Sequence, residues 1–277
     1  MTPQTGWGPD RKRSALSFTF DNLGEAADLE FNKWPASEPV GNHYTVSEVL
    51  PALLNKFDQG KVTFFVEAWN AETYPAMLQK LAAHGHDVAL HGWRHELWGD
   101  LAPERQRDIL QRSLAAFSQI GLRPCGFRPP GGSVAMDPSA LLYEFGFTYY
   151  SASNKQPGVD DGIAQIPFAW QHLDGVYLMP GGAAMVGTPL PGFPEAASLE
   201  GMQGAFNRAI QESIQKGTHL TLVFHPWLLG QDPERLRVLF ELYDSAARNP
   251  HLWVAPCRDV AHWYLKDLPR QAAPLAG

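Results

Sequence analysis

Residues 62–91 read VTFFVEAWNAETYPAMLQKLAAHGHDVALH, and the fold class follows from this stretch. Residues 62–66 form a short apolar run that is typical of a buried strand. Residues 71–84 then place apolar side chains at helical spacing, and Gly85 stands where a left-handed C-cap belongs. Residues 87–90 form a second strand. A strand, a helix and a strand in this order predict a βαβ unit with parallel strands.

The same alternation continues on both sides of this unit. Further strands are predicted at residues 14–20, 126–128, 147–151, 220–224 and 252–255. Helices are predicted between the strands, the longest at residues 103–120, 199–216, 232–247 and 258–266. Such an alternation predicts an α/β fold in which a parallel sheet is covered by helices, either open or closed into a barrel.

One stretch, residues 153–194, is irregular. Short strands are predicted at residues 164–168 and 176–179, and the Gly/Pro-rich run MPGGAAMVGTPLPGFP at 179–194 is predicted to be a long loop. No internal repeat, charge block or low-complexity linker divides the chain. We therefore expect a single domain over residues 1–277, with a core of about 14–266.

Composition excludes several classes of protein. Of the 277 residues 44% are hydrophobic and 18% are charged, which excludes a disordered chain. No apolar run approaches the roughly 18 residues that a membrane helix needs, so no membrane partner is expected. The net charge of −7 disfavours nucleic acid as a partner. The two cysteines are too few for a disulfide framework, and residues 1–18 contain no apolar signal core, so we expect a cytoplasmic protein.

Residues with catalytic chemistry directly follow or end the predicted strands. Asp21 and Asn22 follow SFTF, His91 follows DVAL, Arg128 ends the strand at 126–128, and His225 follows LTLVF. In parallel α/β folds the carboxyl ends of the strands form the rim on which active sites are built. One such residue could be a turn or cap residue, but the coincidence of four positions predicts an active site.

Two histidines in the run HGWRH suggest a metal site. His91 and His95 stand four residues apart, and on one helical turn that spacing directs both imidazoles toward one point, as Zn²⁺ or a similar divalent ion requires. The alternative is that both histidines cap or pack the loop. A third ligand is needed, and Asn22 could supply its amide oxygen, which brings no charge and so binds a divalent cation less strongly than a carboxylate.

Four motifs in this order resemble the polysaccharide deacetylases of carbohydrate esterase family four. They are FTFDN at 18–22, HGWRH at 91–95, FRPPGG at 127–132 and LVFHP at 222–226. The resemblance covers roughly residues 14–260. It implies a distorted (β/α) barrel of about seven parallel strands, and metal-assisted hydrolysis of an N-acetyl or related amide group.

The resemblance also implies roles for individual residues. Asp21 resembles the general base, Arg128 the partner that holds the base carboxylate, and His225 the general acid. The metal ligands would be His91, His95 and either Asn22 or Glu25, because Asn22 occupies the position of the family's metal-binding aspartate. The residues expected to line the substrate pocket are Trp93, Pro130, Gly131, Leu222 and Trp227. The acidic residue that orients the acid histidine has three candidates, Asp160, Asp161 and Asp174, although an aspartate in such a stretch is more often a turn residue.

Three functions compete on these grounds. The first is metal-dependent N-deacetylation of an N-acetylated sugar or small N-acyl substrate, with Zn²⁺ or another divalent ion as cofactor. The second is a metal-independent amide hydrolase of the allantoinase-like kind, which Asn22 and a cytoplasmic location favour. The third is a non-catalytic carbohydrate-binding protein, against which Asp21, Arg128 and His225 together argue. Relatives of the cytoplasmic branch also make a homo-oligomer an expectation.

Overall fold

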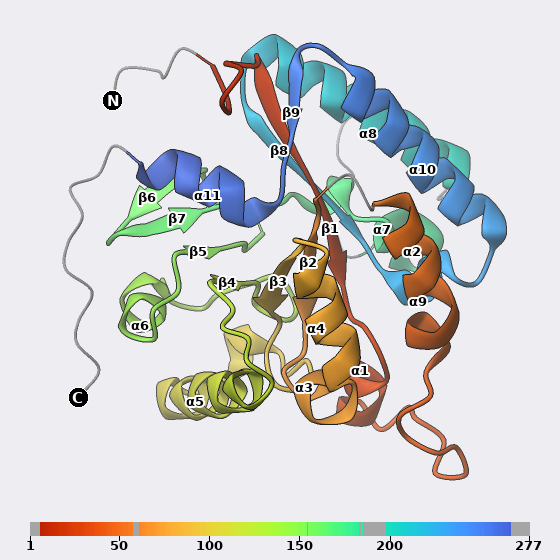
Figure 1. Ribbon diagram of the computed structural model, residues 1–277, viewed down its shortest axis with the longest axis vertical. Helices are drawn as coiled ribbons and strands as arrows, with labels where there is room; N and C mark the ends of the chain where they lie inside the picture. The colour runs from red at the N-terminus through yellow and green to blue at the C-terminus, as the bar shows by residue number, and fades with distance from the viewer. Residues whose placement is uncertain (1–5, 58–60, 154, 183, 185–197, 267–277) are drawn as a thin grey trace.

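Nine strands form one curled sheet in the computed structural model, which describes residues 6–57, 61–153, 155–182, 184 and 198–266 (Figure 1). The order of the sheet is β6-β7-β5-β4-β3-β2-β1-β8, and β9 also pairs with β1. Every pairing is parallel except β6 with β7. The predicted α/β barrel of mostly parallel strands is therefore confirmed. The strands are β1 (Ser14–Asp21), β2 (Thr63–Val66), β3 (Asp87–Leu90), β4 (Gly126–Phe127), β5 (Tyr149–Tyr150), β6 (Gly158–Asp160), β7 (Ile163–Gln165), β8 (His219–Phe224) and β9 (Leu252–Val254).

Strand β1 pairs with three other strands, β2, β8 and β9, and all eight of its residues are buried. It pairs with β8 over six positions, from Ala15 opposite His219 to Phe20 opposite Phe224. It also pairs with β9 near its start and with β2 near its end. The buried polar side chains of this strand are hydrogen-bonded, since the hydroxyls of Ser14, Ser17 and Thr19 donate to the carbonyls of Thr218, Ala255 and Leu222.

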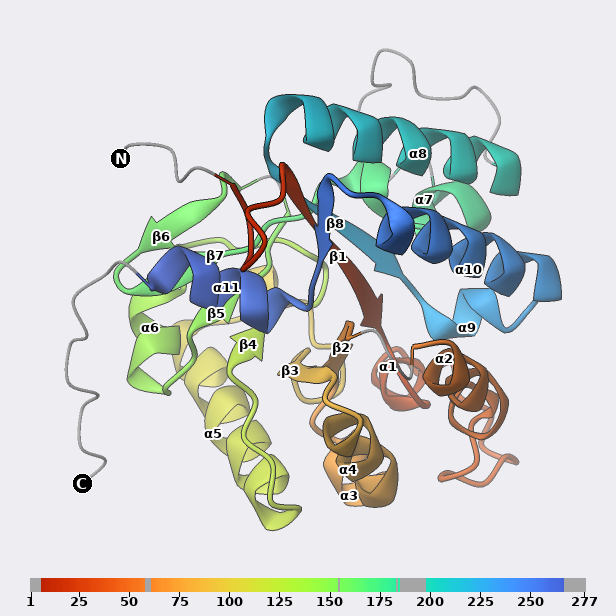
Figure 2. The same ribbon diagram turned by 45° about the horizontal axis from the view of Figure 1, so that its top comes forward.

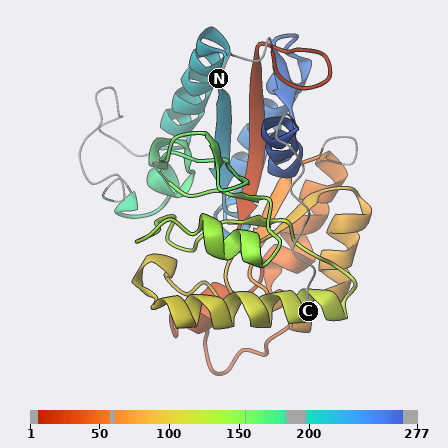
Figure 3. The same ribbon diagram turned by 90° about the vertical axis from the view of Figure 1, so that its left-hand side faces the viewer.

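The long helices lie around the outside of the curled sheet (Figure 2). Figure 3 shows α8 and α11 on opposite sides of β1. Their ends follow local rules, since α8 begins with Ser198 accepting from the Gly201 N–H and ends at Gly217 in the left-handed region. The helices are α1 (Ala26–Glu30), α2 (Leu50–Lys56), α3 (Asn70–Thr73), α4 (Pro75–Ala83), α5 (Pro103–Gln119), α6 (Ser139–Glu144), α7 (Gly175–Leu178), α8 (Leu199–Lys216), α9 (Pro226–Leu229), α10 (Pro233–Arg248) and α11 (Cys257–Leu265), with a π-helical turn at Thr45–Val49 and 3₁₀ turns at Trp98–Asp100 and Trp170–His172.

An irregular segment, residues 168–174, connects the chain just after β5 to the edge strand β8. Phe168 forms a parallel bridge with Ser153, just after β5, and Leu173 forms one with Val223 of β8. The Asp174 N–H then donates to the Val223 carbonyl at 3.0 Å. We call residues 168–174 the seam, because they connect the β5 side of the sheet to β8 where no regular strand does so among the described residues.

The strand predicted at 176–179 is wrong, since the chain forms the helical turn α7 there. Val176 and Tyr177 are buried as the apolar pattern requires, but the Tyr177 and Leu178 N–H groups donate to the Asp174 carbonyl. The run of four apolar residues indicates burial without distinguishing a strand from a helix. Most of the predicted loop at 179–194 lies outside the described residues.

The carboxyl ends of the parallel strands meet at one end of the barrel, and the residues of interest follow them. A cavity of about 530 Å³ lies at the opposite end, lined by residues such as Arg13, Gly217 and His251 that precede β1, β8 and β9. This cavity therefore lies away from the residues that are candidates for catalysis. Within the described part of the chain, no helix is both long enough and apolar enough to cross a membrane.

Candidate active site

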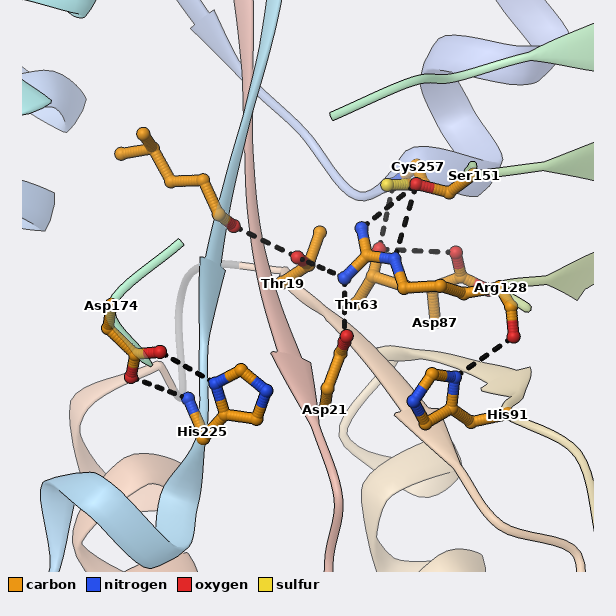
Figure 4. Close-up of polar contacts among 11 residues, drawn as sticks. Thr19, Asp21, Thr63, Asp87, His91, Arg128, Ser151, Asp174, His225 and Cys257 are labelled. Atoms are coloured by element: carbon orange, nitrogen blue, oxygen red, sulfur yellow. Dashed lines mark hydrogen bonds and ion pairs between the residues drawn. The ribbon is translucent and has the colours of Figure 1, made fainter. Parts of the chain in front are cut away.

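Asp21 is the last residue of β1, and it forms a buried ion pair with Arg128. Arg128 Nη1 lies 2.6 Å from Asp21 Oδ1, and the two side chains are 5% exposed or less (Figure 4). The guanidinium also donates to Thr19 Oγ1 at 2.9 Å and to Ser151 Oγ at 2.9 Å. Its partners thus come from β1 and from the end of β5, so the sheet fixes Arg128 and Arg128 fixes the carboxylate of Asp21.

His225 directly follows β8 and is oriented by Asp174 from the seam. Asp174 Oδ1 lies 2.6 Å from His225 Nδ1, and Asp174 Oδ2 accepts the His225 backbone N–H at 2.7 Å. A carboxylate can only accept, so Nδ1 carries a proton and Nε2 is the atom left for chemistry. Burial alone would lower the pKa of His225, but the Asp174 carboxylate outweighs this effect and raises the pKa above 6.5. Of the three aspartates predicted as candidates, Asp174 is the one beside His225.

His91 and His95 lie together at the end of β3, with ring centroids 4.9 Å apart. His91 Nδ1 is 2.9 Å from the Arg128 carbonyl, which can only accept, so Nε2 of His91 keeps its lone pair. His95 Nδ1 is buried and has no hydrogen-bond partner. Burial lowers the pKa of both imidazoles to about 3, so both are neutral near pH 7 and able to bind a cation.

Glu67, which the sequence analysis did not single out, lies beside these two histidines. One ligand atom of each of Glu67, His91 and His95 lies within 4.8 Å of the others. Glu67 directly follows β2, and Asp21 directly follows the strand predicted at 14–20, so the positional rule that found Asp21 could have found Glu67. Asn22 has a buried Oδ1 without a hydrogen-bond partner, whereas both carboxylate oxygens of Glu25 are taken, by the Gly41 N–H and the Tyr74 hydroxyl.

The predicted pocket residues lie in different environments. Trp227 is half-buried, and its ring centroid is 6.2 Å from that of His225. Pro130 and Gly131 follow Arg128, and Gly131 is exposed with a φ of 76°. Leu222 is fully buried within β8, and Trp93 is buried beneath the guanidinium of Arg112, 3.5 Å from its ring centroid. Trp227 and Gly131 are therefore the better placed to meet a substrate.

The charged groups of the site influence one another. The negative charge of Asp21 acts to raise the pKa of His225 and of His95, although in His95 burial dominates and the pKa is lowered. His225 acts to lower the pKa of His91 and His95. Figure 4 shows Asp21 between His225 and His91. The site thus combines three groups: the Asp21 carboxylate held by Arg128, the His225 ring held by Asp174, and the neutral pair of His91 and His95. Such a combination of a base, an acid and possible metal ligands is suited to hydrolysis.

Comparison with known proteins gives the family. The sequence model of polysaccharide deacetylases matches residues 9–150. This chain belongs to the polysaccharide deacetylase family. It is 39% identical over 90 residues to a peptidoglycan deacetylase-like protein of Gibberella zeae, and 34% identical over 98 residues to chitin deacetylase 1 of Saccharomyces cerevisiae. The matches cover 32% and 35% of this chain but only 27% and 32% of those relatives, so the chain matches about a third or less of their length.

Solved structures extend the resemblance over the whole polysaccharide deacetylase fold. A Mycobacterium smegmatis protein assigned to the polysaccharide deacetylases is 25% identical, covers 98% of both chains and has a TM-score of 0.79. The Puue allantoinase has a TM-score of 0.74 with 16% identity, and the match covers 98% of this chain and 96% of that one. At that identity the allantoinase shows the shared fold alone.

Proposed function

We propose that the chain is a metal-dependent hydrolase that removes the acyl group from an N-acetylated carbohydrate. The observation that carries the proposal is the pairing of Asp21 with Arg128 and of His225 with Asp174 around two neutral histidines. The names of the relatives, which are chitin and peptidoglycan deacetylases, support an N-acetylated sugar as the substrate class.

The residues present fit a divalent cation. His91 and His95 are neutral and offer ring nitrogens, a buried carboxylate lies beside them, and the buried atoms His95 Nδ1 and Glu67 Oε1 have no hydrogen-bond partner. Imidazole and carboxylate are the ligands that zinc takes in hydrolytic sites. When bound, such an ion would polarise the acyl oxygen and a water molecule.

Asp21 acts as the general base in the proposed reaction. It accepts a proton from the water that attacks the carbonyl carbon, and Arg128 holds its carboxylate in position while this happens. Because Arg128 is itself fixed by Thr19 and Ser151, the base has little freedom to move. Preorganisation of this kind lowers the barrier, since the geometry is set before the substrate arrives.

His225 acts as the general acid. Its Nε2 donates a proton to the departing nitrogen as the carbon–nitrogen bond breaks, which leaves an acid and a free amine. Asp174 serves this step in two ways: it binds Nδ1 and so leaves Nε2 free to donate, and it raises the pKa of His225, which favours the protonated ring.

An assay of acetate release from N-acetylglucosamine oligomers tests the proposal. We expect turnover that a chelator abolishes and added zinc restores. His225→Ala should lower kcat by about 10²- to 10⁴-fold, whereas His251→Ala, an exposed histidine at the other end of the barrel, should not. Turnover that survives chelation would support the metal-independent alternative, and an unchanged kcat in His225→Ala would remove His225 from the mechanism.

A further inference from the structure

The site has an unusual distribution of acidic residues. Asn22 follows the base Asp21, at the position where the resemblance places a metal-binding aspartate, and the amide brings no charge. We infer that Glu67, at the carboxyl end of β2, is the acidic ligand of the metal site that His91 and His95 complete. The inference rests on the metal-dependent activity proposed above and specifies which strand supplies the charge.

The register of the sheet places Glu67 beside His91. Val66 of β2 pairs with Leu90 of β3, and the His91 N–H donates to the Val66 carbonyl at 2.8 Å. Glu67 and His91 are therefore the first residues beyond two adjacent parallel strands. A carboxylate at this position reaches the same point as the imidazoles, in agreement with the ligand atoms of Glu67, His91 and His95 lying within 4.8 Å of one another.

The burial of Glu67 requires a charge partner or a proton. Its side chain is fully buried, Oε1 has no hydrogen-bond partner, and Oε2 has the Asn70 amide at 3.4 Å. Among the described residues, no arginine or lysine forms an ion pair with it. An unpaired buried carboxylate is costly, and a divalent cation would offset that cost.

The backbone holds the two ligand-bearing loops against each other. The Ala68 N–H donates to the Gly92 carbonyl and the Trp69 N–H to the Trp93 carbonyl, both at 3.0 Å. These bonds continue the β2–β3 pairing past the ends of the strands, on the residues that follow Glu67 and His91. The three ligands are thus preorganised, as a metal site requires.

The alternative acids are less suitable. Glu25 is buried, but the Gly41 N–H at 2.5 Å and the Tyr74 hydroxyl at 2.6 Å occupy its two oxygens. Asn22 has a free buried oxygen, which allows it to contribute a neutral ligand. Its φ of 63° lies in the left-handed region, which aspartate tolerates as asparagine does. Position 22 can therefore accept a carboxylate experimentally.

Zinc binding by protein purified without a chelating tag tests the inference. In competition with a chromophoric chelator, Glu67→Gln should bind zinc at least about 100-fold more weakly than wild type, because it loses the charged ligand. Glu72→Gln, an exposed glutamate in α3, is the matched control and should bind as wild type. Wild-type zinc affinity in Glu67→Gln would overturn the inference.

Thermal melts separate ligation from a purely structural role. Zinc should raise the Tm of wild type but not of Glu67→Gln, whereas the metal-free Tm of the variant should be equal or higher, since an unpaired buried acid has been removed. A lower metal-free Tm with an unchanged zinc-induced shift would assign Glu67 a structural role and contradict the inference.

A second substitution places a carboxylate directly after β1, at position 22. Adding Asn22→Asp to Glu67→Gln should recover zinc binding at least tenfold over Glu67→Gln alone, because position 22 then carries the charge. If wild type binds zinc through Glu67 but hydrolyses no N-acetylated sugar, the proposed activity fails and the ligand assignment stands. If zinc-dependent turnover and zinc affinity are both unaffected in Glu67→Gln, the assignment fails and the activity stands.

Discussion

The pair of Asp174 and His225 determines the protonation of the proposed acid. His225 donates only while it is protonated, and the Asp174 carboxylate raises the pKa of His225 above its ordinary value, which favours the protonated ring. Asp174→Asn removes the charge that raises this pKa. We expect kcat to fall by about 100-fold or more, and the loss of rate on the basic side of the pH profile to begin at lower pH.

The same pair contributes to stability with a definite sign. Because the folded pKa of His225 is raised, the contribution of the pair is full below pH 6.5 and is lost as pH rises through the folded value. The difference in unfolding free energy between wild type and Asp174→Asn should therefore shrink with rising pH. Asp161→Asn, an exposed turn residue, is the control; a pH profile of Asp174→Asn identical to wild type would contradict the assignment.

The pair of Asp21 and Arg128 is a buried ion pair, and removing one partner leaves the other charge uncompensated. Arg128→Met should lower the unfolding free energy by about 3–5 kcal/mol, measured by urea denaturation. The double variant Asp21→Asn/Arg128→Met should recover part of this loss. Arg107→Met, in the exposed pair with Glu144, should leave the urea midpoint close to wild type, and a similar loss in both variants would contradict this account.

Most of the site residues could be predicted from their place at strand ends, and Glu67 shows where that reasoning stopped. Glu67 follows FFV as directly as Asp21 follows SFTF, but it belongs to no motif on which the resemblance rests. The structure draws attention to Glu67 because its buried Oε1 has no hydrogen-bond partner. Only the folded chain shows such an absence.

The loop after β3 holds His95 in an unfavourable backbone conformation. His95 has a φ of 83°, a value that costs a non-glycine residue about 1–3 kcal/mol. Glu96 stabilises this loop, because its buried carboxylate accepts the Trp93 N–H at 2.9 Å and the Arg94 N–H at 3.1 Å. Glu96 is therefore a positioning residue for the proposed metal ligands.

Glu96→Ala should weaken zinc binding by about 10- to 100-fold and lower the unfolding free energy by about 1–3 kcal/mol. Glu96→Gln keeps an acceptor oxygen and should show smaller effects on both quantities. Glu104→Gln, an exposed residue of α5, is the matched control, and calorimetric titration with zinc gives the affinities. A loss of stability in Glu96→Ala with unchanged zinc affinity would restrict Glu96 to a structural role.

Helices and strands could be predicted from the sequence where a clear local signal, such as a capping residue or a terminal glycine, marks their ends. The helix predicted at 199–216 has those same bounds in α8, because a serine cap and a terminal glycine mark its ends. The strand predicted at 176–179 is the helical turn α7, since four apolar residues report burial whatever the backbone does. Helix α1 and strand β6 have weak local signals, and their conformations depend on contacts with distant parts of the chain.

The seam links closure of the barrel to the proposed acid. Residues 168–174 connect the β5 side to β8, and the segment ends in Asp174, whose carboxylate orients His225. Sequence patterns could not locate this closure, because it consists of isolated bridges and single hydrogen bonds rather than a strand. The same lack of a local signal left Asp174 as one of three candidate aspartates.

The seam therefore predicts different consequences for two similar core truncations. Leu173 is buried in the seam opposite Val223, and Leu78 is buried in α4, which is not part of the seam. Leu173→Ala and Leu78→Ala should each lower the unfolding free energy by about 2–5 kcal/mol. At a temperature where both variants are folded, Leu173→Ala should also lower kcat at least about tenfold, because a displaced Asp174 no longer orients His225. NMR titration should show a lower pKa for His225 in Leu173→Ala than in wild type, and an unchanged pKa in Leu78→Ala. Equal kcat values in the two variants would show that closure of the barrel by the seam does not affect catalysis.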